Sequence, residues 1–280
     1  MSTAVAAFLL AVLLWPSVSA AKPERIVSIN LCADQMLLAL AERHAIASLS
    51  RLVADREISA AAVEEIEGIP LNGGRAEEVL ALAPDLVVAG RHAARATIFV
   101  LKKLGYRVME LDIARSIAEI RESIRILGTA IGEGQRAEKL IKAIDARLRR
   151  LAPAASGARL GAVYYQPNGL AAGGDSLVDD VISRAGLINL AAGLGVRGQG
   201  RLPLEMLIMA RPHILIVDAG RPQAPALAFQ VLDHPALTAL TEKAITVAIP
   251  QRLWICGLPA TIEATERLAK LRQSAARRNQ

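Results

Sequence analysis

The amino-acid sequence predicts an α/β fold of two similar halves, each with a mainly parallel sheet, joined by one long α-helix. Short β-branched runs alternate with helical segments, which is the pattern of βαβ units. Residues 77–88 and 205–216 resemble each other, so that a pattern of the first half returns in the second. Between the halves, apolar residues spaced three to four apart predict an amphipathic helix.

The composition suits a folded protein that does not bind nucleic acid. Hydrophobic residues make up 53% of the 280 residues and charged residues 21%, which allows a sizeable core. The formal net charge is +6, but the basic residues are scattered, and only Arg272, Arg277 and Arg278 form a cluster. Because a nucleic-acid interface concentrates lysine and arginine on one element, we expect a solvated basic surface that helps to attract an anionic ligand.

The first 21 residues carry no charged side chain, and residues 4–15 form an apolar run. The run is short for a membrane span, which needs about 20 apolar residues. Val18 and Ala20 fit a signal-peptidase site, so we expect a signal peptide over residues 1–20, cleaved after Ala20, and export of the mature chain. An uncleaved anchor is the alternative, because no lysine or arginine precedes the run.

The first half is expected to span residues 21–132. Its β-branched runs predict strands at residues 25–29, 45–49, 86–89 and 107–111. Helices are expected at residues 35–43, 77–82 and 96–104, with Asp34 as the cap of the first and Gly105 at the end of the last. Residues 55–75 contain several breakers and are expected to be irregular. Ser116 and Glu119 then form a capping-box pattern at the start of another helix.

The connecting helix is assigned to residues 133–155 and the second half to residues 156–280. In this half, strands are expected at residues 160–165, 214–217 and 244–249. Helices are expected at residues 204–210 and 260–273, and from a cap at Asp175 or Ser176 to a point before Gly186. Residues 166–174 are expected to form a glycine-rich loop.

The internal repeat predicts where a ligand would bind. In each copy a helix that begins near a glutamate, Glu77 or Glu205, is stopped by a proline and followed by a buried strand. Two such halves form a crevice at the carboxyl ends of their strands. The loops expected to face it are Asn30–Ala33, Gly90–Ala94, Gln166–Gly169 and Gln251–Pro259.

Several segments together resemble the helical-backbone class of the periplasmic-binding-protein family, which serves importers of iron-siderophores, haem and cobalamin. These segments are Arg25–Asp34, Glu77–Gly90, Ala172–Ser176, Leu187–Asn189 and Leu204–Pro212. The resemblance implies two Rossmann-like lobes bridged by one helix, with limited lobe closure. It also implies a monomeric periplasmic protein that captures a small-molecule ligand and delivers it to the inner-membrane permease of an ABC importer.

The resemblance also implies a docking role for one acidic residue in each lobe. In the family these residues pair with arginines of the permease, and Glu77 and Glu205 match their positions. The simpler alternative for each is an ordinary acid in the first turn of a helix, where it favours the helix dipole.

Candidates for ligand binding lie in or beside the predicted crevice loops. They are Asn30, Leu31, Cys32, Arg91, His92, Tyr165, Asn168, Arg252, Trp254 and Cys256. Trp254 is either a platform for a flat ligand or a lid that packs on its own lobe. The arginines suit the carboxylates or catecholates of a ferric chelate, or else a solvated surface. A tyrosine at the end of strand 160–165 is either a haem-iron ligand or part of the core.

The two cysteines are expected in crevice loops of opposite halves. A disulfide between Cys32 and Cys256 would clamp the lobes, and two free thiols that line the pocket are the alternative.

The expected ligand is a ferric siderophore or cobalamin, and the alternative is a haem or Zn/Mn-ion receptor of the same architecture. None of the four histidines has metal-ligand spacing, so no metal site and no cofactor are expected. The sequence lacks a nucleophile elbow, a Walker loop, a dinucleotide-binding motif and a C-x-x-C pair. An exported α/β enzyme is therefore the less favoured interpretation, and no catalytic residue is assigned.

Overall fold

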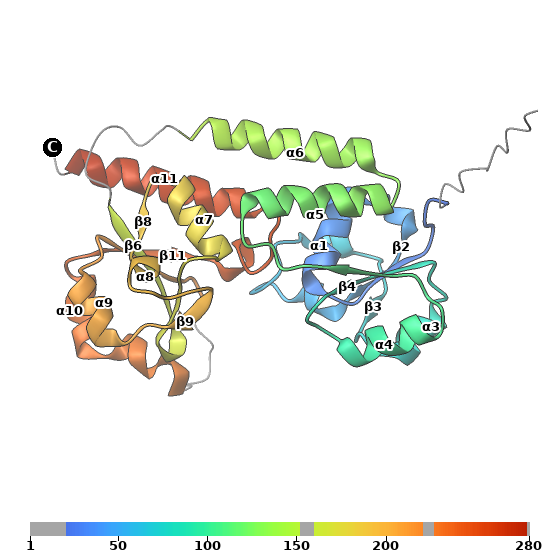
Figure 1. Cartoon of the computed structure of the whole chain (residues 1–280), viewed down its shortest axis with the longest axis horizontal. Coiled ribbons are helices and arrows are strands. Elements are labelled where there is room, and N and C mark those ends of the chain that lie inside the picture. Colours follow the sequence, from blue (N-terminus) through green and yellow to red (C-terminus); the bar gives the residue numbers. More distant parts are fainter. Residues whose placement is uncertain (1–20, 152–159, 221–226, 279–280) are drawn as a thin grey trace, which may run out of the picture.

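The structure is a computed structural model that describes residues 21–151, 160–220 and 227–278. In these parts two α/β lobes lie side by side, and α5 (Ile117–Ala130), α6 (Gly134–Arg149) and α11 (Thr261–Arg278) run along one side of them (Figure 1). The predicted signal peptide, residues 1–20, lies outside the described residues. None of the helices in the described parts is long and apolar enough to cross a membrane.

The N-terminal lobe contains a parallel sheet with the strand order β3-β2-β1-β4-β5. Its strands are β1 (Ile26–Ser28), β2 (Ile46–Ser50), β3 (Leu71–Asn72), β4 (Leu86–Gly90) and β5 (Val108–Leu111). The helices before α5 are α1 (Leu31–Leu40), α2 (Val63–Ile66), α3 (Ala76–Ala81) and α4 (Arg95–Lys103). One face of β1 and β4 packs on α1 and α5, and the other packs on α3 and α4. Burial on both faces explains why these strands are continuous apolar runs.

The C-terminal lobe contains a mixed sheet with the strand order β11-β10-β6-β7-β9, and β8 also pairs with β6. Its strands are β6 (Gly161–Gln166), β7 (Leu170–Ala172), β8 (Ile188–Asn189), β9 (Gln199–Arg201), β10 (Ile214–Asp218) and β11 (Ile245–Ile249). Its helices before α11 are α7 (Leu177–Arg184), α8 (Leu190–Gly193), α9 (Leu204–Ala210) and α10 (Pro235–Thr241). Only the pairs of β7 with β6 and β9 are antiparallel among the described strands, so the predicted fold class is confirmed.

The backbone confirms the internal repeat. The pairing of β1 with β4 corresponds to that of β6 with β10, and β2 and β5 flank the first pair as β8 and β11 flank the second. In both copies a left-handed residue follows the helix and precedes the proline, Ala83 with φ 45° and Arg211 with φ 46°. A residue before proline disfavours the right-handed helical region, so each helix ends there.

In each copy of the repeat, the side chain of the residue after the proline accepts a hydrogen bond from a backbone amide at the start of the neighbouring strand. The Asp85 carboxylate accepts a hydrogen bond from the Arg25 amide at 3.1 Å, and His213 Nδ1 accepts one from the Gly161 amide at 3.1 Å. An aspartate and a histidine thus satisfy equivalent amides at the start of β1 and β6, which is a likeness that the sequence alone does not show.

The start of α1 differs from the prediction. Asn30 is the N-cap, because its side chain accepts from the amides of Cys32 at 3.0 Å and Ala33 at 3.2 Å. The helix therefore begins at Leu31 and not after Asp34. Asp34 is fully buried and accepts a hydrogen bond from the Ser50 amide at 2.9 Å.

The shorter elements were not predicted. Residues 55–75 contain α2 and β3, and the expected loop at 166–174 contains β7. The elements α8, α10, β8 and β9 are likewise additions to the prediction. All are two to seven residues long, too short to show a hydrophobic period.

Two predicted helix starts are confirmed. The Ser116 side chain accepts from the Glu119 amide at 3.1 Å, and that of Ser176 accepts from the Asp179 amide at 3.2 Å. In a capping box the Glu119 carboxylate would accept from the amide of the N-cap residue, Ser116. Here it accepts from the Arg115 amide instead.

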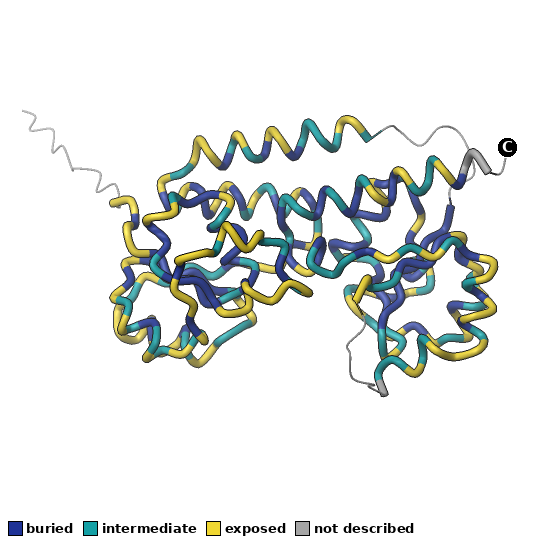
Figure 2. The backbone as a smooth tube through the Cα atoms, turned by 180° about the vertical axis from the view of Figure 1, so that it is seen from behind, coloured by how far each residue is buried: buried dark blue, intermediate teal, exposed yellow. Residues whose placement is uncertain are grey.

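The α6 helix contacts helices of both lobes. Its buried stripe of Ala137, Ile141 and Ile144 belongs to a core that continues from the N-terminal lobe into the C-terminal lobe. Buried and exposed residues alternate along it, whereas the strands at the centre of each lobe are buried (Figure 2). Near its end Arg147 makes a two-pronged ion pair with Glu266 of α11, at 2.9 and 2.8 Å. The boundaries at residues 133 and 155 remain a prediction.

Candidate ligand-binding site

A cavity of about 1030 Å³ lies between the two lobes. The N-terminal lobe supplies the residues that follow β4 and β5 and one face of α5, and the C-terminal lobe supplies the end of β6, the start of α7, β9 and the loop after β11. Its volume is at the upper end of the range for small-molecule sites. The cavity therefore has room for a large ligand, at the carboxyl ends of the strands where the repeat predicts it.

The cavity wall includes large apolar side chains that are exposed. Ile113 is 66% exposed, Ile126 49% and Ile255 38%, and all three line the cavity. Large aliphatic side chains left open to water at one place mark a binding surface, because their burial by a ligand is favourable.

Two aromatic rings form the wall on the side of the C-terminal lobe. The rings of Tyr164 and Trp254 lie with their centroids 4.7 Å apart, tilted by 53°. The Tyr164 hydroxyl donates to the Asp218 carboxylate and accepts from Gln166 Nε2 at 2.9 Å. Trp254 is 5% exposed and packs against Tyr164 of β6, so it presents only part of its ring to the cavity.

Burial shifts the pKa values of the Tyr164 hydroxyl and of the Asp218 carboxylate. Burial raises the pKa of the Tyr164 hydroxyl well above its ordinary value, and the Asp218 carboxylate beside it adds to this. Burial also raises the pKa of Asp218, although the bond from Tyr164 opposes that shift. Tyr164 therefore stays a neutral phenol and is a poor source of phenolate for iron.

Charged residues line the side of the N-terminal lobe in ion pairs. Arg91 Nε lies 2.9 Å from Asp112 Oδ1, and Arg115 lies 3.6 Å from Glu119. His92 lies beside Arg91 in the same wall.

The cysteines form a disulfide between the lobes. Cys32 in the first turn of α1 is bonded to Cys256 in the loop after β11, with the two Cα atoms 5.2 Å apart. The next residue, Gly257, lies so close to Ala114 that an added Cβ would be 2.5 Å from the Cβ of Ala114. The loop that carries Trp254 is thus held on the N-terminal lobe, although its flanking elements belong to the C-terminal lobe.

The structure separates the predicted ligand residues into two sets. Arg91, His92 and Trp254 line the cavity. Seven others are not part of its wall: Asn30, Leu31, Cys32, Tyr165, Asn168, Arg252 and Cys256.

These seven residues have other surroundings in the structure. Tyr165 belongs to the core, is 1% exposed and donates to the Leu202 carbonyl at 3.3 Å. Its neighbour Tyr164 takes the place in the wall, because successive residues of a strand point to opposite faces. Asn30 caps α1, Leu31 is buried, and the cysteines are bonded to each other. Asn168 is an exposed turn residue and Arg252 lies half-buried beside the wall.

Sequence reasoning missed the contribution of α5 and of the loop after β5. These parts supply Ile113, Arg115, Glu119, Glu122 and Ile126. The capping-box pattern located the helix, but nothing in it shows that one face of the helix borders a cavity. Gln166 and Ile255 do lie in predicted crevice loops and could have been included.

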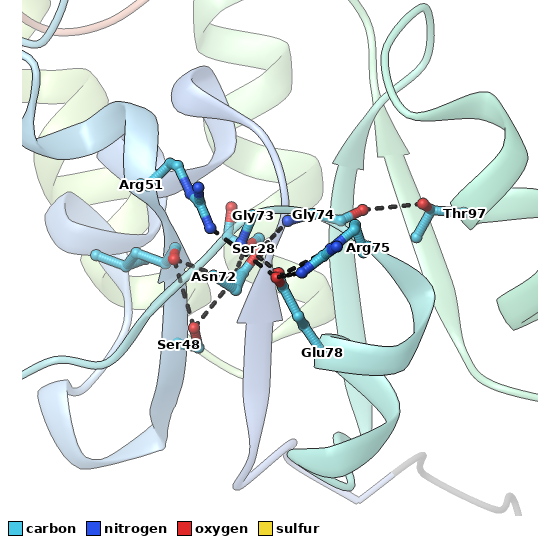
Figure 3. A network of polar contacts seen from close by, with 10 residues as sticks. Ser28, Ser48, Arg51, Asn72, Gly73, Gly74, Arg75, Glu78 and Thr97 are labelled. Carbon is cyan, nitrogen blue, oxygen red and sulfur yellow. Dashed lines mark hydrogen bonds and ion pairs between the residues drawn. The ribbon is translucent and has the colours of Figure 1, made fainter.

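Glu77 and Glu205 occupy equivalent places on the two lobes. Each is exposed in the first turn of its helix, α3 or α9. The turn before α3 is held by Glu78, which accepts from the Gly73 amide and pairs with Arg75, while Thr97 donates to the Gly74 carbonyl at 2.9 Å (Figure 3). This network uses Glu78 and leaves Glu77 facing solvent.

A buried amide fixes the strands beneath this turn. Asn72 Nδ2 lies 2.9 Å from the Ser28 carbonyl, the Ser48 hydroxyl and the Leu49 carbonyl, and so joins β1, β2 and β3 (Figure 3). These bonds therefore hold the turn before α3 in a fixed place on the sheet.

The histidines, cysteines and acids of the described residues do not gather into a cluster that could hold a metal ion. A bare Zn or Mn ion needs about three or four convergent ligands, so this alternative finds no support in the described parts.

Comparison with known proteins agrees with this geometry. Residues 26–248 match the family model described as periplasmic binding protein. A protein named cobalamin-binding protein from Halobacterium salinarum (strain ATCC 29341 / DSM 671 / R1) is 26% identical over 213 residues, which is 74% of this chain and 58% of that protein. The match thus spans 58% of the length of this curated relative.

Two solved structures have a similar fold. The periplasmic heme-binding protein RhuT from Roseiflexus sp. RS-1 in apo form is similar with a TM-score of 0.73 and 24% identity, over 90% of this chain and 99% of that one. The periplasmic vitamin B12 binding protein BtuF of Vibrio cholerae is similar with a TM-score of 0.67 and 17% identity, over 91% of this chain and 98% of that one. At these identities the likeness concerns the fold.

Proposed function

This chain belongs to the periplasmic binding protein family, and on that premise we propose that it captures a metal chelate or a corrinoid between its lobes and delivers it to the permease of an ABC importer. Capture is reversible and involves no covalent chemistry. We place the mature protein in the periplasm, after removal of residues 1–20, as a monomer.

One observation carries the proposal. The 1030 Å³ cavity is lined from both lobes, and the exposed isoleucines Ile113, Ile126 and Ile255 line it together with the Tyr164–Trp254 pair. A large ligand with apolar faces would cover these side chains, which supplies the binding free energy. The charged and amide groups around them would then orient the ligand.

A corrinoid is the first candidate, a ferric siderophore the second and haem the third. The relative from Halobacterium salinarum is named a cobalamin-binding protein, which favours the corrinoid. Haem is less favoured because the tyrosine in the wall, Tyr164, keeps its proton: its hydroxyl donates a hydrogen bond to Asp218 and its pKa is raised. An iron-ligating tyrosine has to give up that proton.

Delivery would use the two exposed acids. Glu77 and Glu205 lie on equivalent helices, one in each lobe, so a permease with two arginine sites could hold both lobes together. Charged pairs at the rim of an interface set orientation and association rate more than affinity.

The fluorescence of Trp254 tests the capture step, because it is the one tryptophan after residue 20. The chain from residue 21 is titrated with cyanocobalamin, a ferric hydroxamate and haemin, and calorimetry measures the same affinities independently. We expect saturable one-to-one binding of at least one of them. The proposal is wrong if none binds, or if a ligand in excess is chemically converted.

A variant pair connects binding to the cavity. Trp254→Ala should weaken binding by about tenfold, since truncating an aromatic anchor typically costs more than 1 kcal/mol. Phe99→Ala is the control, because Phe99 is 62% exposed on α4 and lies outside the cavity wall. Equal affinities for the two variants would place the ligand elsewhere.

A further inference from the structure

We propose that the cleft selects an uncharged or cationic metal complex and discriminates against an anionic one. This inference rests on the proposed function and narrows its ligand class. It is the opposite of what the net charge of +6 predicts for the whole chain. The difference arises because the charges that line the cleft are distributed unlike those of the remaining surface.

The wall contains more carboxylates than guanidinium groups. Among the described residues, its acids are Glu110, Asp112, Glu119, Glu122 and Asp175. Its arginines are Arg91 and Arg115. His92 is the further titratable base in the wall.

Both arginines of the wall are already paired. Arg91 is held by Asp112 at 2.9 Å and Arg115 by Glu119 at 3.6 Å. Neither guanidinium can bind a ligand carboxylate or catecholate without leaving its partner or sharing it. A ligand anion would therefore gain one ion pair at the expense of another, in contrast to a site with unpaired arginines.

The other three acids are neutralised from outside the wall. Lys102 pairs with Glu110, Arg125 with Glu122 at 3.0 Å, and Arg197 with Asp175 at 2.5 Å. None of these three cations lines the cavity. From the cavity, a ligand is therefore closer to the carboxylates than to their cationic partners, and the local potential opposes a negative charge.

The uncharged polar groups of the wall complete the argument. Amides and hydroxyls come from Ser123, Gln166, Ser176, Gln199 and Gln251. Gln199 Nε2 donates to Gln166 Oε1, so these two amides are hydrogen-bonded to each other. Such groups match a ligand whose rim consists of amides or hydroxamates, because both partners offer donors and acceptors without charge.

Four metal complexes of different charge test the selection. They are cyanocobalamin, which is uncharged, cationic ferrioxamine B, ferric enterobactin with three negative charges, and haemin with its carboxylates. Affinities are measured by calorimetry and by Trp254 fluorescence. We expect cyanocobalamin or ferrioxamine B to bind at least about tenfold tighter than either anion, as unfavourable charge interactions near a surface amount to a kcal/mol or more. An anion that binds tightest overturns the inference and leaves the proposed function standing, whereas failure of all four to bind overturns both.

A carboxylate variant links the selection to the wall. Replacing Glu119→Gln together with Glu122→Gln removes two negative charges, releases Arg115 and leaves Arg125 paired with Glu138 alone. The affinity for ferric enterobactin should rise by about tenfold or more relative to that for the uncharged complex. Glu138→Gln is the matched control, because Glu138 pairs with the same Arg125 at 2.9 Å from α6, outside the wall. The inference is also overturned if the double variant and the control bind the anion equally, or if the double variant changes both affinities alike.

Discussion

At the scale of single residues, the cleft and the core use acidic side chains differently. The acids of the cleft are half-exposed and paired, whereas Asp34 in the core is fully buried and has no cationic partner among the described contacts. Burial raises the pKa of Asp34 to about 6, and hydrogen bonds from Ser50 oppose that shift. A carboxylate that is hard to ionise in the folded state makes folding depend on pH.

The first prediction concerns Asp34. Its pKa is higher in the folded state, about 6, than in the unfolded chain, so the folded protein binds an additional proton between about pH 4 and 6. The contribution of Asp34 to the free energy of unfolding is therefore greatest below this window and falls as pH rises through it, by roughly 3 kcal/mol in total. Asp34→Asn should remove this loss, because an asparagine side chain does not titrate. The variant should still fold, because Asn Oδ1 can accept from the Ser50 amide as the carboxylate does.

Urea unfolding at intervals from pH 4 to pH 8 measures the effect of Asp34→Asn. The difference in free energy of unfolding between variant and parent should grow from pH 4 to pH 6 and then stay constant. Glu64→Gln, at an exposed acid of α2, should follow the parent curve. A constant difference across the whole range would contradict the shift.

At the scale of elements, the α3–β4 and α9–β10 units place one glutamate at the same point of each lobe. Both helices end in a left-handed residue before a proline, and both strands belong to the buried centre of a sheet. The helices therefore cannot slide or lengthen, and the distance between Glu77 and Glu205 depends on how the lobes are arranged.

The second prediction concerns these glutamates. Glu77→Lys and Glu205→Lys together should abolish uptake of the ligand in cells if the proposed docking is right, since like charges would then face the arginines proposed on the permease. Ligand affinity of the purified variant should remain within about twofold of the parent, because neither residue lines the cavity. Radiolabelled ligand uptake and calorimetry measure the two quantities separately.

Glu64→Lys is the control for the docking variant, since it reverses an exposed acid at the start of α2 in the N-terminal lobe, the lobe that also carries Glu77. Uptake should survive this change. Normal uptake by the double variant would show that Glu77 and Glu205 are ordinary acids at the starts of their helices.

At the scale of the whole molecule, the lobes are connected by more than the chain between them. The core is continuous through α5, α6 and α11, and the Cys32–Cys256 disulfide joins residues 224 positions apart. Because Gly257 packs on Ala114 next to the disulfide, the C-terminal lobe is seated on the N-terminal lobe at this point. The lobes therefore have little freedom to separate here.

The third prediction concerns the disulfide. Replacing both cysteines by serine should lower the free energy of unfolding by roughly 2–5 kcal/mol, because a cross-link over a long loop restricts the unfolded chain. Chemical denaturation of the variant and of the parent with and without reductant measures this. In reductant, the free energy of unfolding of the parent should approach that of the variant. A denaturation curve of the parent that reductant leaves unchanged would contradict a stabilising cross-link. Ligand dissociation should be faster in the variant, as the loop of Trp254 loses its attachment to α1.

The amino-acid sequence by itself determined the fold class, the longer helices and strands, the repeat and the places of Glu77 and Glu205. These features depend on local patterns, such as Glu77 to Pro84 and its second copy, which remain visible in a single chain. It also located three loops that contribute to the cavity wall, those with Arg91, Gln166 and Trp254.

Only the tertiary structure decided which side chains face the cavity. Tyr164 and Tyr165 differ by one position on a strand, and the packing of β6 alone places the first in the wall and the second in the core. The same is true of Ile113 and Ile126, which look like ordinary core residues in the sequence, and of the cysteines, whose pairing requires two lobes to meet. Contacts between segments that are far apart in the chain depend on how whole elements pack, and no local pattern encodes that arrangement.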